Sequence, residues 1–146
     1  MTEQEVTILD KLGVDVGFKT TFSKTITESD ISLLAAVSGD YNPVHVNEEY
    51  AKRTFFKGRI THGLMPLCIT SAAMSACLPG VIVWLSESTR FLAPVRIGDT
   101  LTGGGEVTAA RKDKGIITMK IACANQRGEN VIEGEWVIRL FEPPSY

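Results

Sequence analysis

The feature that most constrains the fold of this chain is a run of 27 residues, 60–86, that contains no Asp, Glu, Lys or Arg. A run of this length is long enough to cross a bilayer as a helix. Gly63, Pro66 and the pair Pro79-Gly80 interrupt it, however, and residues 81–85 are β-branched and aromatic. The run therefore predicts a helix, a turn and a strand of a folded protein, and no membrane partner.

The helix of this run is expected between Leu64 and Leu78, where small and apolar residues lie on all sides. A helix that is apolar all round belongs inside a sheet or an interface, so we expect it to be fully buried. Pro66 is tolerated only in the first turn, where its missing N–H has no partner in any case. The helix should therefore begin between Gly63 and Met65.

The residues before this run predict a strand and a helix. Alternating apolar positions from Phe18 to Ile26 indicate a first strand. Thr27 and Asp30 have the spacing of a capping box, and Gly39 is suited to a left-handed C-cap, so a helix is expected between them. After it, the turn-forming residues 38–43 predict a loop from Asp40 to His45.

Asn47 is expected to cap a further short helix that carries Tyr50 and Ala51. The C-terminal half then alternates apolar and polar residues over three segments, at 100–110, 117–123 and 132–140. Turns fit at residues 113–115 and 126–128, and the triple glycine at 103–105 suggests a β-bulge. This order predicts an α+β fold in which a helix lies on one face of a curved antiparallel sheet.

Composition excludes several classes of protein. The chain is 44% hydrophobic and 22% charged with a net charge of -2, which is typical of a soluble globular domain. Its Lys and Arg residues are dispersed, so no nucleic-acid partner is expected. The acidic N-terminus shows no secretory pattern, and we expect a cytoplasmic location.

The odd number of cysteines, at spacings that match no metal motif, predicts three buried thiols. These residues are Cys68, Cys77 and Cys123. We expect neither a metal nor an organic cofactor.

Asp40 and His45 are the candidate catalytic residues, because a carboxylate and an imidazole together can move protons near neutral pH. Such a pair in a turn is, on its own, more typical of an aspartate in an Asx-turn beside a solvated histidine. The residues around the pair favour the catalytic interpretation.

Residues 37–47 resemble the hydratase-2 signature of MaoC-like dehydratases and of the (R)-specific enoyl-CoA hydratases that feed polyhydroxyalkanoate synthesis. The match rests on Gly39-Asp40, Asn42-Pro43 and His45. Residues 62–65 are similar to the His-Gly segment that opens the central helix in this family, and residues 90–99 to its later strand and turn. The resemblance runs from about residue 22 to residue 140.

This resemblance implies a hot-dog fold, an antiparallel β-sheet wrapped around a long central helix, with residues 1–146 as a single MaoC-like domain. It also implies a homodimer whose two sheets join at their edges, and an acyl-CoA thioester as the substrate. The implied reaction of fatty acid metabolism is the reversible addition of water to trans-2-enoyl-CoA, which gives (R)-3-hydroxyacyl-CoA. Asp40 and His45 would hold the water between them.

The resemblance also assigns supporting residues. Gly63 would donate a backbone N–H to the thioester oxygen, and Ser71 and Asn42 would help to position the water or the loop. The candidates for substrate binding are His62, Leu64, Phe56 and Trp84. Cations for the CoA phosphates are Lys52, Arg53, Lys57, Arg59 and Arg90.

Three alternatives stay open on the sequence. The same scaffold serves acyl-CoA thioesterases, because a fold alone does not determine the reaction. The thioester carrier is either CoA or an acyl carrier protein. A non-catalytic thioester-binding module, or a subunit of a heteromeric dehydratase, would not need both Asp40 and His45.

Overall fold

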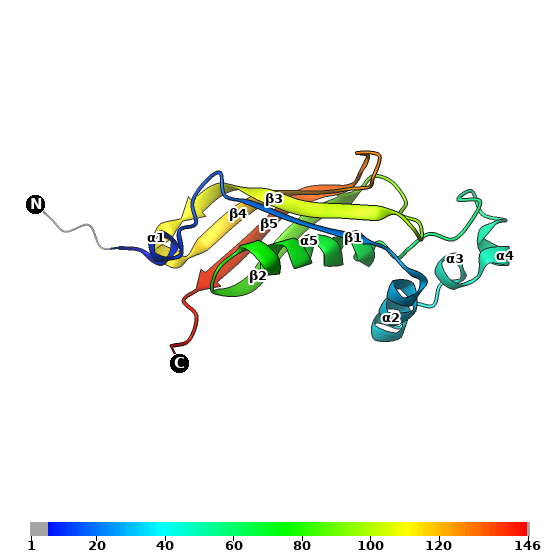
Figure 1. Ribbon diagram of the computed structural model, residues 1–146, viewed down its shortest axis with the longest axis horizontal. Helices are drawn as coiled ribbons and strands as arrows, with labels where there is room; N and C mark the ends of the chain where they lie inside the picture. Colours follow the sequence, from blue (N-terminus) through cyan, green and yellow to red (C-terminus); the bar gives the residue numbers. More distant parts are fainter. Residues whose placement is uncertain (1–5, 146) are drawn as a thin grey trace, which may run out of the picture.

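A computed structural model describes residues 6–145. A single antiparallel sheet of five strands has the order β1-β3-β4-β5-β2, and the long helix α5 lies along one of its faces (Figure 1). The strands are β1 Lys19–Thr25, β2 Val81–Phe91, β3 Thr100–Arg111, β4 Ile116–Ala124 and β5 Asn130–Phe141. This is the expected α+β architecture of the hot-dog fold.

Helices occupy both ends of the sheet. The short helix α1, Ile8–Leu12, lies beside the 3-10 turn Lys112–Lys114 at the end where the chain termini are found (Figure 1). The helices α2, Glu28–Ser38, α3, Pro43–Val46, and α4, Glu48–Ala51, lie together beyond the opposite end. We call residues 27–62 the extension.

The boundaries of α2 follow from local capping. The Thr27 side chain accepts the Asp30 N–H while the Asp30 carboxylate accepts the Thr27 N–H, which is a complete capping box. At the other end Gly39 takes a left-handed φ of 74° that a residue with a side chain rarely adopts. Both ends agree with the sequence-based prediction.

Helix α5 runs from Leu64 to Cys77, with Pro66 in its first turn as expected. Pro66 cannot donate to the His62 carbonyl, and the Met65 N–H takes that acceptor instead, at 2.9 Å. The prediction that the helix is fully buried is wrong. It packs on β1, β3 and β4, and its opposite side leaves Leu64 and Cys68 exposed.

The core lies between α5 and the sheet. Ile117, Met119, Ile121 and Cys123 of β4 are all buried, as their alternation predicts. Burial of each large aliphatic side chain stabilises the fold by about 1.5–3 kcal/mol. The prediction of three buried thiols is confirmed for Cys123 alone, since Cys77 is only partly buried and Cys68 is exposed.

The triple glycine of β3 does not form a bulge. Residues 103–105 pair in regular register with both neighbouring strands, and the irregularity lies further on, between Val107 and Ala109. A Cβ on Gly103 would come within 2.8 Å of the Thr70 side chain and 2.9 Å of its backbone nitrogen. The absence of a side chain at Gly103 therefore allows α5 to approach the sheet closely.

Strand β2 forms one edge of the sheet and carries unusual apolar exposure. Val81, Val83, Trp84, Leu85 and Phe91 are all exposed by at least a third. Helix α5 covers the half of the sheet nearest β1. The opposite edge strand, β2, therefore lacks a covering layer. Within residues 6–145, no helix is long and apolar enough to span a membrane.

Candidate active site

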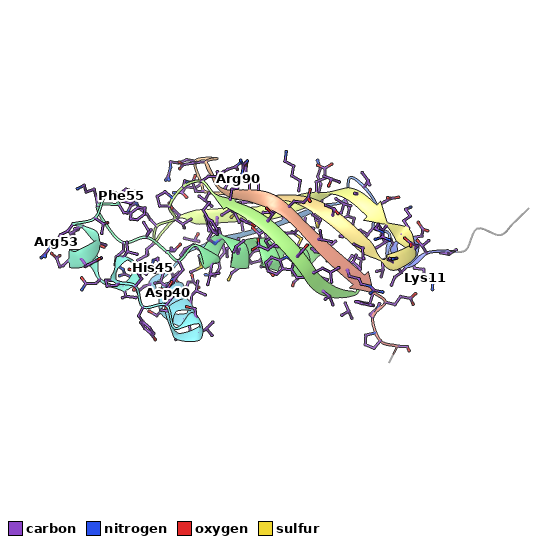
Figure 2. The ribbon with its side chains drawn as sticks, turned by 180° about the vertical axis from the view of Figure 1, so that it is seen from behind. Lys11, Asp40, His45, Arg53, Phe55 and Arg90 are labelled. Carbon is purple, nitrogen blue, oxygen red and sulfur yellow. The ribbon has the colours of Figure 1, made fainter. Side chains whose placement is uncertain are left out.

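Asp40 and His45 lie in the extension, close to the first turn of α5 (Figure 2). The prediction of a loop from Asp40 to His45 is wrong in part, because His45 lies on the helical turn α3. The Asn42 side chain caps that turn by accepting the Val44 N–H at 3.2 Å, and Pro43 supplies a preset φ at the first helical position. Asn42 therefore holds the backbone of the segment.

The side chain of His45 is buried, whereas that of Asp40 is about half exposed. His45 Nδ1 lies 2.9 Å from the Ile60 carbonyl oxygen, which can only accept, so Nδ1 carries the proton of the neutral ring. The lone pair of Nε2 then faces Asp40 Oδ2 at 3.7 Å. That gap is too long for a hydrogen bond and leaves both atoms free to bind one water.

The second oxygen of Asp40 has a structural role. Oδ1 accepts the Asn42 N–H at 3.1 Å in an Asx-turn, and the Asp40 N–H donates to Ser38 Oγ at 3.1 Å. The carboxylate is therefore oriented by its own backbone. The Asx-turn of the non-catalytic interpretation is present, but its histidine is buried instead of solvated, and the turn presents Oδ2 to that histidine.

His62 lies beneath this pair and is fully buried. Its Nε2–H donates to the Asp40 carbonyl oxygen at 2.8 Å, and its ring stacks on that of His45 with centroids 4.1 Å apart. Within residues 6–145, Nδ1 of His62 is the one buried side-chain polar atom without a hydrogen-bond partner. His62 thus fixes the positions of Asp40 and His45 from below.

Arg59 ties the extension together, a role that the sequence did not reveal. Its Nε donates to the His45 carbonyl at 2.7 Å, and its two terminal nitrogens bind the Glu28 carboxylate at 3.1 and 2.7 Å. These bonds lower the pKa of Glu28 below its ordinary value. The guanidinium therefore joins α2 to α3, and its positive charge is paired with the Glu28 carboxylate.

Gly63 stands at the start of α5, where a helix leaves N–H groups without partners. No acceptor in residues 6–145 takes the Gly63 N–H, and its α-carbon is exposed. A Cβ there would come within 3.2 Å of the Phe91 ring. A side chain at position 63 would therefore press on the Phe91 ring, and glycine keeps the start of the helix clear.

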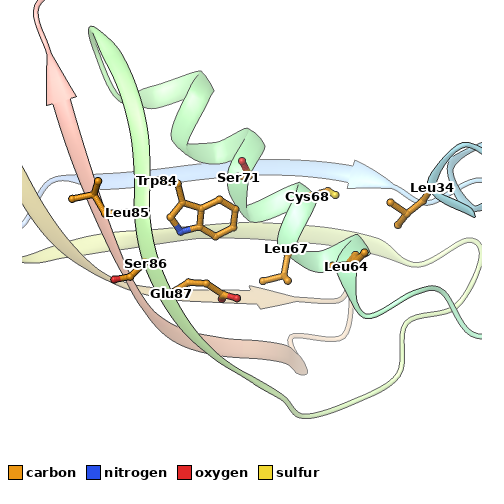
Figure 3. A pocket seen from close by; sticks show the side chains of 9 residues that line it. All are labelled: Leu34, Leu64, Leu67, Cys68, Ser71, Trp84, Leu85, Ser86 and Glu87. Carbon is orange, nitrogen blue, oxygen red and sulfur yellow. The ribbon is translucent and has the colours of Figure 1, made fainter. Parts of the chain in front are cut away.

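Two cavities meet the extension. One, of about 420 Å³, is lined by His45, His62, Gly63, Phe56 and Phe91, among others. The other is an apolar groove of about 670 Å³ between α5 and β2, to which Leu64, Cys68, Ser71 and Trp84 contribute (Figure 3). The predicted site residues are therefore divided between two spaces, except that Asp40 and Asn42 line neither of them.

Ser71 lies in the groove, two turns along α5 from Gly63, or about 12 Å at the helical rise. Within the described chain its hydroxyl makes no hydrogen bond to Asp40. Trp84 stacks on Trp136 at 4.1 Å and forms part of the groove wall. Partial burial at the groove raises the pKa of the Cys68 thiol, which makes it a weak nucleophile at neutral pH.

Asp40, His45 and His62 form a group whose potential ligand atoms lie within 4.8 Å of one another. His62 Nε2 already binds the Asp40 carbonyl and His45 Nδ1 the Ile60 carbonyl, so one nitrogen of each ring is occupied. The arrangement fits proton transfer better than metal coordination.

This chain is similar to several known proteins. Residues 13–126 match the model of the MaoC like domain family. The chain is 45% identical over 125 residues to an (R)-specific enoyl-CoA hydratase from Rhodospirillum rubrum, covering 85% of this chain and 86% of the relative. It is 35% identical over 128 residues to the (R)-specific enoyl-CoA hydratase of Aeromonas caviae, covering 87% and 96%.

A solved structure has the same fold over nearly the whole chain. The R-hydratase PhaJ1 from Pseudomonas aeruginosa, in its unliganded form, superposes with a TM-score of 0.83 and 36% identity, covering 97% of this chain and 96% of the other. The helix-on-sheet fold with an Asp–His pair in the extension defines a class of hot-dog hydro-lyases. This chain belongs to the MaoC-like domain family.

Proposed function

We propose that the protein is an (R)-specific enoyl-CoA hydratase, which reversibly adds water to trans-2-enoyl-CoA to give (R)-3-hydroxyacyl-CoA. The family and the names of relatives at 45% and 35% identity support the reaction class. The observation that carries the proposal is the 3.7 Å gap between Asp40 Oδ2 and His45 Nε2, next to the unpaired N–H of Gly63.

In the proposed mechanism one water lies between Asp40 and His45. The Nε2 lone pair of His45 takes a proton from this water as its oxygen forms a bond to Cβ of the enoyl group. The proton that leaves the water is passed through the pair and reaches Cα on the same face from the Asp40 side, so the double bond is consumed, both hydrogens of the water end on the product, and Asp40 and His45 return to their starting states. Because the two groups act on one water, their proton-transfer roles belong to the pair.

Negative charge develops on the thioester oxygen during this addition. We propose that the Gly63 N–H stabilises it, because that donor has no other partner and lies at the positive end of the α5 dipole. Dehydration follows the same path backwards. No step uses a metal or an organic cofactor.

Substrate binding is proposed to use both spaces beside the extension. The cavity lined by Phe56, His45 and Gly63 suits the thioester and its pantetheine arm. The apolar groove of Leu64, Ser71 and Trp84 suits the acyl chain. The positioning of water by Ser71 stays a prediction, which the hydration rate of Ser71→Ala would test.

We also propose that two copies form a homodimer through β2. This edge strand exposes Val83, Trp84 and Leu85 together with its unpaired backbone groups. In soluble proteins another element or a second chain normally covers such a surface. Sedimentation at micromolar concentration should give twice the chain mass. A fully active monomer would contradict this.

The reaction is tested with crotonyl-CoA. Loss of the enoyl absorbance without release of free thiol supports hydration, whereas equimolar thiol release would identify a thioesterase. Chiral analysis of the product should give the (R)-3-hydroxy isomer. Crotonyl-acyl carrier protein in a parallel assay separates the two carriers.

The related (R)-hydratase of A. caviae is involved in PHA biosynthesis. The product proposed here belongs to the same chemical class of (R)-3-hydroxyacyl thioesters. A role in supplying such monomers for polymer synthesis is proposed on that basis. Co-expression with a polymerising enzyme that accepts (R)-3-hydroxyacyl-CoA would test it through polymer content.

A further inference from the structure

The structure sorts the five cations that the sequence offers for substrate phosphates. Arg59 is bound to Glu28, Lys52 to Glu49 and Arg90 to Glu133. The side chains of Arg53 and Lys57 have no acidic partner and no hydrogen bond within residues 6–145, and only their backbone N–H groups are bonded, to the Tyr50 and Thr54 carbonyls. Two free positive charges therefore remain, four residues apart on one loop.

This loop stands at the outer end of the extension. Figure 2 shows Arg53 and Phe55 beyond His45, at the end of the molecule farthest from Lys11. Phe55 and Phe56 both line the cavity that contains His45 and Gly63. The loop is therefore the outer wall of the space that leads to the catalytic pair.

Phe55 has an unusual environment for an aromatic residue. Its side chain is 82% exposed, and its ring stacks on Phe56 with centroids 4.0 Å apart. Phe56 is partly buried and supports the outer ring from behind. One face of an aromatic platform is therefore presented to solvent at the mouth of the cavity, where a planar base could stack.

The loop is braced rather than free. Arg96 donates to the Phe56 carbonyl at 2.5 Å and to the Arg59 carbonyl at 3.2 Å, and Thr54 Oγ1 bonds the Ala51 carbonyl at 2.7 Å. Lys57 is also the one non-glycine residue with positive φ in residues 6–145, at 57°. A left-handed lysine costs conformational energy, and such strain is characteristic of positions with a function.

We infer that residues 53–57 form the subsite for the nucleotide end of CoA. This inference rests on the proposed function, which puts the thioester at Gly63. The pantetheine arm then runs outwards past Phe56, the adenine stacks on Phe55, and Arg53 and Lys57 bind the phosphates. The unpaired charges and the exposed ring are thereby both explained by one ligand.

The test compares substrates with and without the nucleotide. Crotonyl-CoA and crotonyl-pantetheine carry the same reacting group, and the second lacks all the phosphates and the adenosine. In the double variant Arg53→Gln/Lys57→Gln, kcat/KM for crotonyl-CoA should fall about tenfold, mainly through KM, as expected for two exposed charge pairs. The value for crotonyl-pantetheine should stay within about twofold of wild type on the same reasoning.

A direct binding measurement does not depend on turnover. Calorimetry with CoA itself should show a similar loss of affinity in the double variant, and a smaller one in Phe55→Ala. Wild-type protein should bind 3′-dephospho-CoA more weakly than CoA, and the double variant should lose most of that difference. A protein that binds CoA at this loop but hydrates no enoyl thioester would refute the proposed reaction while supporting the subsite.

The matched control is Arg111→Gln/Lys114→Gln. It removes the same two types of charge from exposed positions at the opposite end of the sheet, by the 3-10 turn. Its kinetics on both substrates should equal wild type. The subsite is wrong if the control falls as far as the loop variant, if the loop variant loses activity equally on both thioesters, or if its CoA affinity is unchanged.

Discussion

The extension and the helix-on-sheet layer are held together by different forces. In the extension, caps, Asx-turns and the bonds of Arg59 determine the positions of the side chains, and few large apolar residues are buried there. In the layer, α5 and the sheet enclose a contiguous apolar core. The proposed chemistry therefore lies where packing is sparse, so substitutions should separate activity from stability.

The largest effect is expected from the catalytic pair. Asp40→Asn and His45→Gln should each lower the hydration rate by at least about a hundredfold, the usual scale for a general acid-base group. Asp40 is half exposed, and glutamine at position 45 can still donate to the Ile60 carbonyl, so folding should be retained. Steady-state hydration of crotonyl-CoA, with thermal unfolding as the folding control, measures both.

The double variant should be little slower than either single variant, because the two residues act on the same water. A folded single variant that keeps more than about a tenth of the wild-type rate would contradict the mechanism.

In the layer, Gly103→Ala should affect stability instead. The added methyl group would meet Thr70 at 2.8–3.0 Å, and α5 would have to move away from β3. We expect the free energy of unfolding to fall by about 2 kcal/mol, as is usual for overpacking. Denaturant unfolding measures this, with Glu106→Gln on the exposed side of the same strand as the control; equal stability of the two variants would refute close helix-to-sheet contact.

His62 belongs to the extension, and its proposed role is to position His45 and Asp40. His62→Gln should lower the hydration rate about tenfold, less than either catalytic variant, because loss of the stacked ring allows His45 and the Asp40 backbone to shift. The pH profile of kcat should keep the shape of wild type. A loss as large as that of His45→Gln would make His62 a direct participant.

Two identical capping boxes offer a smaller, matched test. Thr27→Ala at α2 and Thr7→Ala at α1 should each destabilise the fold by about 1 kcal/mol, but only the first lies in the extension and should also slow hydration.

Hydrogen bonds from Thr7, and then from Lys112, lower the pKa of Asp10 to about 2. That contribution is complete above the ordinary pKa of an aspartate and disappears as the pH falls towards 2.

In Thr7→Ala the pKa of Asp10 should therefore rise towards its ordinary value. A carboxyl titration followed by NMR measures this, and an unchanged pKa would show that Lys112 alone is sufficient.

The smallest expected effect is that of a chelator. Dialysis against EDTA should leave the rate of hydration unchanged, since the proposed steps use only Asp40, His45 and the Gly63 N–H. A large loss that a divalent cation restores would mean that the group of Asp40, His45 and His62 holds a metal after all.

The sequence predicted most of the fold, because its signals are local. Thr27, Asp30 and Gly39 give the limits of α2 through contacts only a few residues apart, and the alternation in β4 gives its buried face. The loop predicted through His45 was wrong because a cap and a proline at the first helical position can nucleate a single turn even in a cluster of turn-forming residues.

The site was predicted less completely. Asp40 and His45 came from a resemblance, and their separation agrees with the proposed use. The bonds that orient them run to the carbonyl groups of Ile60, Asp40 and His45, and a backbone carbonyl leaves no trace in the amino-acid sequence. The exposure of Cys68 was missed because it follows from the one-sided packing of α5 on the sheet.

The proposed proton-transfer pair and the proposed oxyanion donor, from Asp40 to the N–H of Gly63, come from one contiguous stretch between the first strand and the central helix. The strands that enclose the core contribute none of the proposed proton-transfer groups. Arg96 is the contact from outside this stretch that braces its loop, through the Phe56 and Arg59 carbonyls. A chimera carrying residues 27–63 on another scaffold of this kind, with an arginine at the position of Arg96, would therefore show whether the proposed chemistry moves with the stretch.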